Sequence, residues 1–205
     1  MADTYKNYAE LSASETQGVD YVMNYFSKQS SAVIMAIHGG GIETGTSELT
    51  RDIAGLSHSY YLFEGLKSSG NGILHITSTN FDEPNALRMV AEADYCLSLH
   101  GYADSLKKHT LIGGADHNVK LQVYNKLIAA GFSAELLDET DRLSGSDPAN
   151  IVNKTKRGMG VQLELSTLQR NAFFGINTRA DRKNTQTEEF YRYTQALKDV
   201  FGTLV

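Results

Sequence analysis

The sequence has one cysteine, two prolines and no tryptophan among its 205 residues. A single thiol, Cys96, excludes an internal disulfide and a thiolate metal cluster, and its apolar neighbours favour a small core residue. No apolar run reaches the length of a membrane span, and residues 1–10 lack the basic and then apolar pattern of a signal peptide. We therefore expect synthesis in the cytoplasm without a signal peptide, with release by another route left open.

The composition predicts one globular domain, residues 1–205, because 41% of the residues are hydrophobic and 21% are charged, with no repeat or low-complexity tract. Charge is unevenly distributed. Residues 151–205 hold nine Lys and Arg against five Asp and Glu, whereas residues 1–150 hold ten against nineteen. This distribution argues against nucleic-acid binding and permits a focused site for an anionic substrate. We expect no nucleic-acid or membrane partner, and a monomer.

An apolar run, a histidine, three glycines and a glutamate follow one another near residue 40. Residues 33–37 are typical of a strand buried on both faces, and His38 stands where that strand should end. Glycines 39–41 permit a sharp turn that brings Glu43 towards His38. Because ligands gather at the carboxyl ends of strands in open α/β sheets, the pair predicts a metal site, and zinc accepts both ligand types.

Three other interpretations of this stretch compete with a metal site. Glycine runs before helices cradle phosphates, but the Gly-x-x-x-x-Gly-Lys-Ser/Thr pattern is absent and Glu43 would repel an anion. His-Gly-Gly-Gly also forms oxyanion holes in esterases, but the sequence has no Gly-x-Ser-x-Gly elbow. A plain structural turn with a hydrogen-bonded His38 stays open.

A second histidine repeats the arrangement, since residues 95–99 form another short apolar run that His100 follows. His38, Glu43 and His100 together make a His2Glu set, which leaves zinc an open fourth position for water. His109 and His117 lie among polar neighbours in predicted loops. We expect both to be solvated and assign them no metal.

Residues 161–166 alternate apolar and polar side chains, as a strand does, and place Glu164 in its middle. Glutamate is depleted in strands, so this carboxylate needs either an ion-pair partner or a catalytic task, such as general base beside a metal-bound water. Four basic residues bracket the strand and either hold an anionic substrate or pair with acidic loops: Lys154, Lys156, Arg157 and Arg170.

The remaining patterns predict further strands and helices. Strands are expected at residues 21–26, 60–66, 72–77, 110–112 and 132–137. A helix with Leu49, Ile53 and Leu56 on one face begins with Thr46 or Ser47 as its cap. Other helices begin at Pro84, follow the cap Asp116, and cover residues 187–201.

The chain resembles the poly-γ-glutamate hydrolases of the phage type. The resemblance is carried by the sequences of residues 38–43 (HGGGIE), 97–101 (LSLHG) and 160–166 (GVQLELS), and it extends to residues 5–21 and 75–84. It implies a single-domain α/β fold like that of zinc carboxypeptidases, with a mixed, mostly parallel central sheet flanked by helices.

The resemblance implies that His38, Glu43 and His100 bind one Zn²⁺ per chain and that Glu164 is the catalytic base. Two features depart from the pattern. Zinc carboxypeptidases separate the first histidine and the glutamate by two residues, whereas four intervene here. The family commonly has an arginine where this chain has Lys154, and lysine lacks the planar fork of arginine.

The implied reaction is hydrolysis of the γ-glutamyl amide bonds of poly-γ-glutamate. Every unit of that polymer carries a free α-carboxylate, and Lys154, Arg157 and Arg170 are the candidates to bind it. Two alternatives stay open: a zinc amidase of small N-acyl amino acids, which would prefer short neutral substrates, and a binding module for acidic polymers, which would tolerate loss of Glu164.

Overall fold

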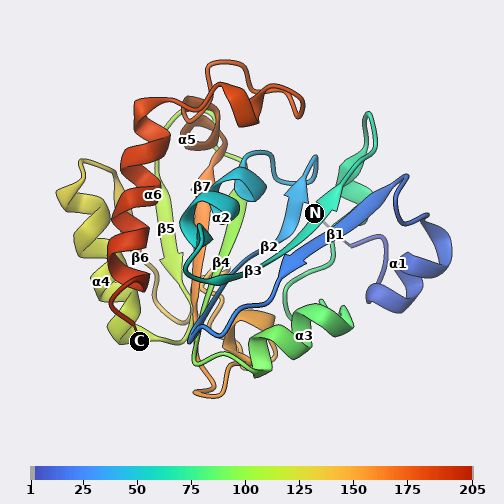
Figure 1. Cartoon of the computed structure of the whole chain (residues 1–205), viewed down its shortest axis with the longest axis horizontal. Helices are drawn as coiled ribbons and strands as arrows, with labels where there is room; N and C mark the ends of the chain where they lie inside the picture. The colour runs from blue at the N-terminus through green and yellow to red at the C-terminus, as the bar shows by residue number, and fades with distance from the viewer. Residues whose placement is uncertain (1–2, 205) are drawn as a thin grey trace.

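A seven-stranded mixed sheet forms the centre of the computed structural model, which describes residues 3–204 (Figure 1). The strands are β1 (Tyr21–Phe26), β2 (Ala32–Gly40), β3 (Ser59–Gly65), β4 (Tyr95–Tyr102), β5 (Thr110–Gly113), β6 (Ala134–Leu136) and β7 (Val161–Ser166). Their order is β1-β3-β2-β4-β7-β5-β6. The four central strands β3, β2, β4 and β7 are parallel, so their carboxyl ends meet at one edge. Strands β1 and β5 run antiparallel to their inner neighbours β3 and β7.

Helices cover both faces of the sheet (Figure 1). They are α1 (Tyr8–Ser14), α2 (Thr46–Ala54), α3 (Pro84–Ala91), α4 (His117–Ala129), α5 (Thr167–Ala172) and α6 (Glu188–Phe201), with short 3-10 turns η1 (Asn71–Leu74), η2 (Ile151–Asn153) and η3 (Arg182–Asn184). Helices α2, α4 and α6 pack on one face, and α3 with η1 and η2 packs on the other.

Strand β2 shows why the sheet is buried on both sides. Ala32 and Ile34 enter the core beneath α2 and α6, whereas Val33, Met35 and Ile37 enter the core beneath α3. Because alternate side chains of a strand point to opposite faces, a continuous apolar run is what a doubly covered strand requires. The expected strand is confirmed, and it continues through His38 to Gly40.

Most of the other expected elements are confirmed, including the bounds of β1 and β7 and the Asp116 cap of α4. The prediction of a strand at residues 72–77 is wrong, because residues 71–74 form a 3-10 turn. Gly70 adopts φ 72° before it, and Asn71 Nδ2 donates to the Lys67 carbonyl at 2.8 Å. The turn preference of the glycine and asparagine therefore outweighs the strand preference of the side chains that follow them.

The start and end of α2 also differ from expectation. Its cap is Gly45 at φ 95°, without a side-chain hydrogen bond, while the Thr46 hydroxyl donates to the Glu43 carbonyl at 2.8 Å. The helix ends at Ala54, and Leu56 beyond it is 88% exposed. The face of α2 that packs on the sheet therefore ends at Ala54 and does not include Leu56.

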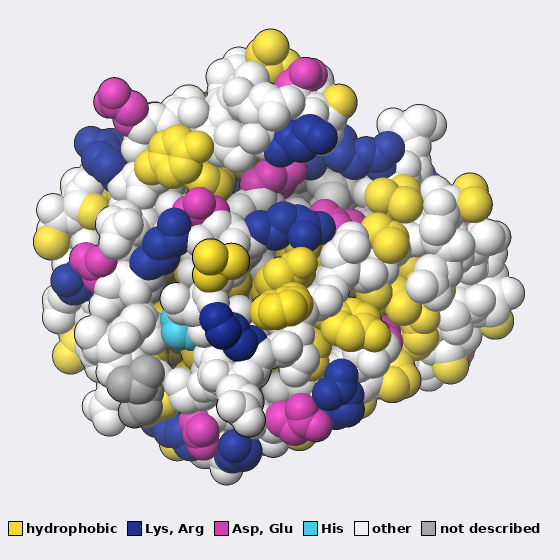
Figure 2. Space-filling model, viewed as in Figure 1, with side chains coloured by type: hydrophobic (Ala, Val, Ile, Leu, Met, Phe, Trp, Pro, Cys, Tyr) yellow, Lys and Arg dark blue, Asp and Glu magenta, His cyan; other side chains and the backbone are white. Residues whose placement is uncertain are grey.

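Within residues 3–204, the structure contains no helix with the length and apolar character needed to cross a bilayer. On the face drawn in Figure 2, lysine and arginine side chains lie among aspartates and glutamates. Cys96 is buried in the core, as expected. The α/β class is confirmed for the described residues, and the outermost residues 1–2 and 205 of the expected domain lie outside them.

Candidate functional site

A cavity of about 1140 Å³ opens where the central parallel strands end. Side chains from β2, β4, β7 and the turns after them line it, as the strand-end patterns predict. His38, Glu43, His100, Glu164 and Arg170 are all among the lining residues. The cavity therefore brings together five of the seven residues that the sequence singled out for the site.

The glycine turn after β2 sets the position of Glu43. Gly40 adopts φ 67°, and a Cβ there would lie 2.6 Å from the Gly65 carbonyl oxygen, so this position requires glycine. The chain then turns back until the Glu43 amide donates to the His38 carbonyl at 2.8 Å. As a result, Glu43 Oε1 lies 3.2 Å from His38 Nδ1.

Arg182 fixes this turn from the far side. Its side chain is only 2% exposed, donates from Nη2 to the Gly40 carbonyl at 3.1 Å, and pairs through Nε with Glu48 Oε1 at 2.8 Å. A cation from η3 and a carboxylate from α2 thus hold the backbone that carries Glu43. No periodicity in the sequence predicts this long-range contact.

His100 reaches the same point from β4. Its Nδ1 lies 3.0 Å from His38 Nδ1 and 3.6 Å from Glu43 Oε2, and both rings are 2% exposed. In the β4–β7 register His100 stands opposite Glu164. Residues far apart in the sequence therefore converge on one buried point at the edge of the sheet.

The nitrogen that each ring turns away from this point has a partner of its own. His38 Nε2 lies 2.8 Å from the Ile76 carbonyl oxygen, and His100 Nε2 lies 2.8 Å from Ser98 Oγ. Metal-binding histidines are typically fixed in this way by hydrogen bonds of the second nitrogen. Ligands about 2.0–2.1 Å from a tetrahedral zinc lie about 3.3 Å apart. The 3.0 Å between the two Nδ1 atoms and the 3.2 Å from His38 Nδ1 to Glu43 Oε1 are close to that value, and His100 Nδ1 faces the other carboxylate oxygen, Oε2, at 3.6 Å.

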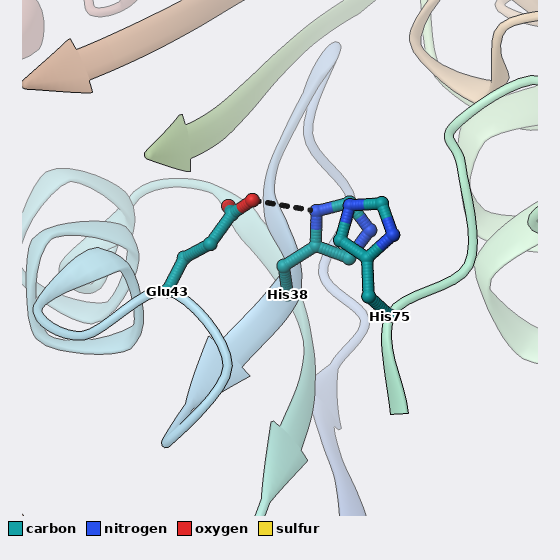
Figure 3. Close-up of side chains that lie close together, drawn as sticks. All are labelled: His38, Glu43 and His75. Atoms are coloured by element: carbon teal, nitrogen blue, oxygen red, sulfur yellow. Dashed lines mark ion pairs between the residues drawn. The ribbon is translucent and has the colours of Figure 1, made fainter. Parts of the chain in front are cut away.

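A third imidazole lies beside the pair. His38, Glu43 and His75 offer potential ligand atoms within 4.8 Å of one another (Figure 3). The His75 ring stacks on His38 at 4.0 Å between centroids, and its Nδ1 lies 2.8 Å from Asp3 Oδ1. His75 is therefore a second candidate, beside His100, for the third ligand of a metal ion held by His38 and Glu43. No local pattern singles out His75, which directly follows a 3-10 turn where a strand was expected, although the resemblance to the hydrolases extends to residues 75–84.

Charge coupling favours a protonated His38 beside an ionised Glu43. Burial lowers the pKa of His38, but the Glu43 carboxylate more than offsets this and raises it above its ordinary value. Burial would raise the pKa of Glu43, yet the His38 charge and hydrogen bond bring it down to about 2. Burial lowers the pKa of His100 to about 3. One anionic carboxylate beside two imidazoles is a set of donor atoms that a divalent cation can take over in exchange for the proton.

Glu164 stands beside this cluster without an ion-pair partner at bonding distance in the described chain. It is 7% exposed, and its Oε1 accepts a hydrogen bond from Gln162 Nε2 at 3.0 Å. Burial raises the pKa of Glu164 well above its ordinary value, and the negative charge of Glu43 adds to this. A buried carboxylate with a raised pKa in a cavity is typical of an acid–base group.

The basic residues expected to hold a substrate divide into two groups. Arg170 lines the cavity, and its guanidinium donates to the Thr44 carbonyl at 3.0 Å. Arg157 lies outside the lining, where it pairs with Asp116 at 2.6 Å. Lys154 also lies outside the lining, at the end of η2. The loop after β6 supplies another arginine to the lining, Arg142.

The two histidines assigned no metal differ in environment. His117 is exposed, as expected. The expectation of a solvated His109 is wrong, because the residue is 7% exposed and its Nδ1 lies 2.7 Å from Ser133 Oγ. Its position at the start of β5, against the β6 side, accounts for this burial.

Fold and site together define a single-domain α/β protein of the zinc carboxypeptidase-like fold class. A family model described as poly-gamma-glutamate hydrolase matches residues 5–196, and the chain belongs to this family. The SPbeta prophage-derived UPF0714 protein YoqZ of Bacillus subtilis (strain 168) is 48% identical over 196 residues, which cover 96% of this chain and 70% of YoqZ.

Solved structures agree with this assignment. The structure of a bacteriophage poly-gamma-glutamate hydrolase is 41% identical, covers 99% of this chain and 98% of its own, and superposes with a TM-score of 0.94. Zinc-free YndL is 43% identical, covers 99% of each chain, and has a TM-score of 0.95. N-formylglutamate amidohydrolase from Ralstonia eutropha covers 89% of this chain and 96% of its own; at 9% identity and a TM-score of 0.51 it shares the fold alone.

Proposed function

We propose that this protein is a zinc-dependent hydrolase that cleaves the γ-glutamyl amide bonds of poly-γ-glutamate. The observation that carries the proposal is the convergence of His38, Glu43 and His100 at 3.0 to 3.6 Å, with Glu164 on the neighbouring strand. Membership of the poly-gamma-glutamate hydrolase family supports the substrate. The zinc-free description of the YndL structure supports the metal.

His38, Glu43 and His100 would hold the zinc ion. A zinc ion in this position would supply an acidified water molecule and a Lewis acid for the amide carbonyl. Glu164 accepts a proton from the attacking water and returns it to the leaving amide nitrogen. The raised pKa of Glu164 suits both the uptake and the return of the proton. A group that acts first as a base and then as an acid works best when its pKa lies near the operating pH.

Arg170 supports this arrangement from the floor of the cavity. Its charge opposes the rise in the pKa of Glu164, and its own pKa is lowered by burial. Since its guanidinium binds the Leu165 carbonyl of β7 and the Thr44 carbonyl of the turn before α2, Arg170 joins two walls of the cavity, and its charge compensates the Glu43 and Glu164 carboxylates. Lys154 and Arg157 stay expected substrate contacts, for polymer extending beyond the cavity.

The test is cleavage of high-molecular-weight poly-γ-glutamate, followed by product size, after chelation and after zinc add-back. We expect chelation to abolish cleavage and zinc to restore it. The Glu164→Gln variant should retain zinc and lose roughly 10²- to 10⁴-fold in turnover, the usual contribution of a general base. Full activity of the metal-free protein, verified by elemental analysis, would exclude zinc dependence. Full activity of Glu164→Gln would place the base elsewhere.

A further inference from the structure

Two arginines line the cavity, and one of them is already engaged. Arg170 is 7% exposed and donates to the Leu165 and Thr44 carbonyls and to the Thr167 hydroxyl. These bonds occupy donors on all three guanidinium nitrogens. Arg170 therefore has little capacity left for a bidentate bond to a ligand.

Arg142 differs in each of these respects. Its side chain is exposed, lines the cavity, and makes neither an ion pair nor a hydrogen bond with any residue between 3 and 204. Its positive charge still acts on the buried base, since it opposes the rise in the pKa of Glu164. Arg142 is thus a cation with all its donors available, positioned within electrostatic reach of the reaction centre.

The loop that carries Arg142 is anchored close by. The Ser144 carbonyl accepts a hydrogen bond from the Gly114 amide at 2.6 Å, and the Gly145 carbonyl accepts one from Asn153 Nδ2 at 2.8 Å. Gly145 adopts φ 61° and packs directly against Gln162, where a Cβ would lie 2.8 Å from the amide. An anchored loop presents its side chain to the cavity at a lower entropic cost than a mobile one.

We propose that Arg142 is the receptor for the substrate α-carboxylate next to the scissile amide, and so selects anionic γ-glutamyl chains over neutral amides. In poly-γ-glutamate this carboxylate is borne by the carbon bonded to the amide nitrogen that Glu164 must protonate. A guanidinium binds a carboxylate through two parallel hydrogen bonds, which gives orientation as well as affinity. The inference rests on the proposed function.

The experiment compares two γ-glutamyl oligomers of equal length, one with free α-carboxylates and one with α-carboxamides. For Arg142→Gln we expect the KM of the carboxylate oligomer to rise about tenfold, as loss of one charge-assisted hydrogen bond predicts. Because the Arg142 charge also lowers the pKa of Glu164, the two proteins are compared at their own pH optima, where kcat should stay within about twofold and the carboxamide oligomer should be cleaved equally by both. Arg142→Lys should recover part of the discrimination. Arg88→Gln, which removes an exposed arginine on α3, is the matched control.

Binding to the zinc-loaded protein, measured by titration calorimetry with the same oligomers, separates the inference from the proposed function. A parent that cleaves neither oligomer but binds the carboxylate form through Arg142 would refute the proposed function and support the receptor. If Arg142→Gln still prefers the carboxylate oligomer to the carboxamide oligomer as strongly as the parent does, Arg142 is not the receptor, whereas the proposed hydrolysis is unaffected. A parent that neither binds nor cleaves either oligomer would refute both.

Discussion

Replacement of Gln162 by methionine is expected to change the pH dependence of the reaction. Gln162 Nε2 donates to Glu164 Oε1 at 3.0 Å, and Asn150 Nδ2 donates to Gln162 Oε1 at 2.9 Å. Asn150 Oδ1 in turn accepts the Val152 amide at 3.1 Å. Because a backbone amide can only donate, it fixes the orientation of Asn150, which fixes that of Gln162. The relay therefore presents an N–H donor to the base.

The size of the effect follows from the bond that is lost. A hydrogen bond to a charged group contributes about 1.5–3 kcal/mol, and one pKa unit corresponds to about 1.36 kcal/mol. Methionine has nearly the volume of glutamine but no donor, so the pKa of Glu164 should rise by about one to two units. In the proposed reaction Glu164 is the base, and it can accept a proton only when its carboxyl group is deprotonated. The acid limb of the activity profile should therefore move to higher pH by the same amount.

The assay is kcat/KM against pH for the zinc-loaded parent and Gln162→Met. Asn150→Asp provides a second perturbation, since aspartate still caps Val152 but cannot donate to Gln162, and it should shift the limb in the same direction. Gln195→Met on the exposed face of α6 is the control and should leave the profile unchanged. A lower rate at every pH with an unmoved acid limb would refute this reasoning and leave Gln162 a purely structural role.

Three further outcomes follow from the site geometry. His100→Ala should lose stoichiometric zinc while His75→Ala retains it, and elemental analysis showing the reverse would exchange their roles. Arg182→Met should lower the free energy of unfolding in urea by about 3–5 kcal/mol, because Glu48 is left without its buried partner. Adding Glu48→Gln to this variant should restore part of the lost stability. A loss below about 1 kcal/mol for Arg182→Met would contradict the prediction. Gly40→Ala should weaken zinc binding measured by chelator competition, since φ 67° and the contact with Gly65 disfavour a side chain, and unchanged affinity would show that the turn adapts.

The sequence was most informative where side-chain chemistry coincided with hydrophobic periodicity. His38 and His100 each follow an apolar run, and Glu164 lies on the polar side of an alternating strand, so pattern and chain direction place all three at one edge. The strands confirm that placement, while the ligand and base roles stay predictions.

The sequence was least informative where loops and long-range contacts decide the structure. Arg142 and His75 lie in segments without periodicity, and nothing local predicts which arginine is engaged and which is available. Arg157 illustrates the same limit, because its pairing with Asp116 depends on the approach of α4 to the loop before β7. Proximity in sequence to the strand that carries Glu164 thus does not tell which basic residues line the cavity.

The order of strands has a consequence for how the protein becomes active during synthesis. Strand β7 lies between β4 and β5 although it is the last strand along the chain, and His38 and His100 are already 62 residues apart. Closing such long loops slows folding, and the earlier strands cannot form a continuous sheet until β7 inserts. A chain shortened before residue 161 would lack both its base and the link between the two halves of its sheet. Hydrolysis would then report completion of the central sheet, because Glu164 lies on β7, whereas the three proposed metal ligands lie on β2, directly after it and on β4, which pair without β7.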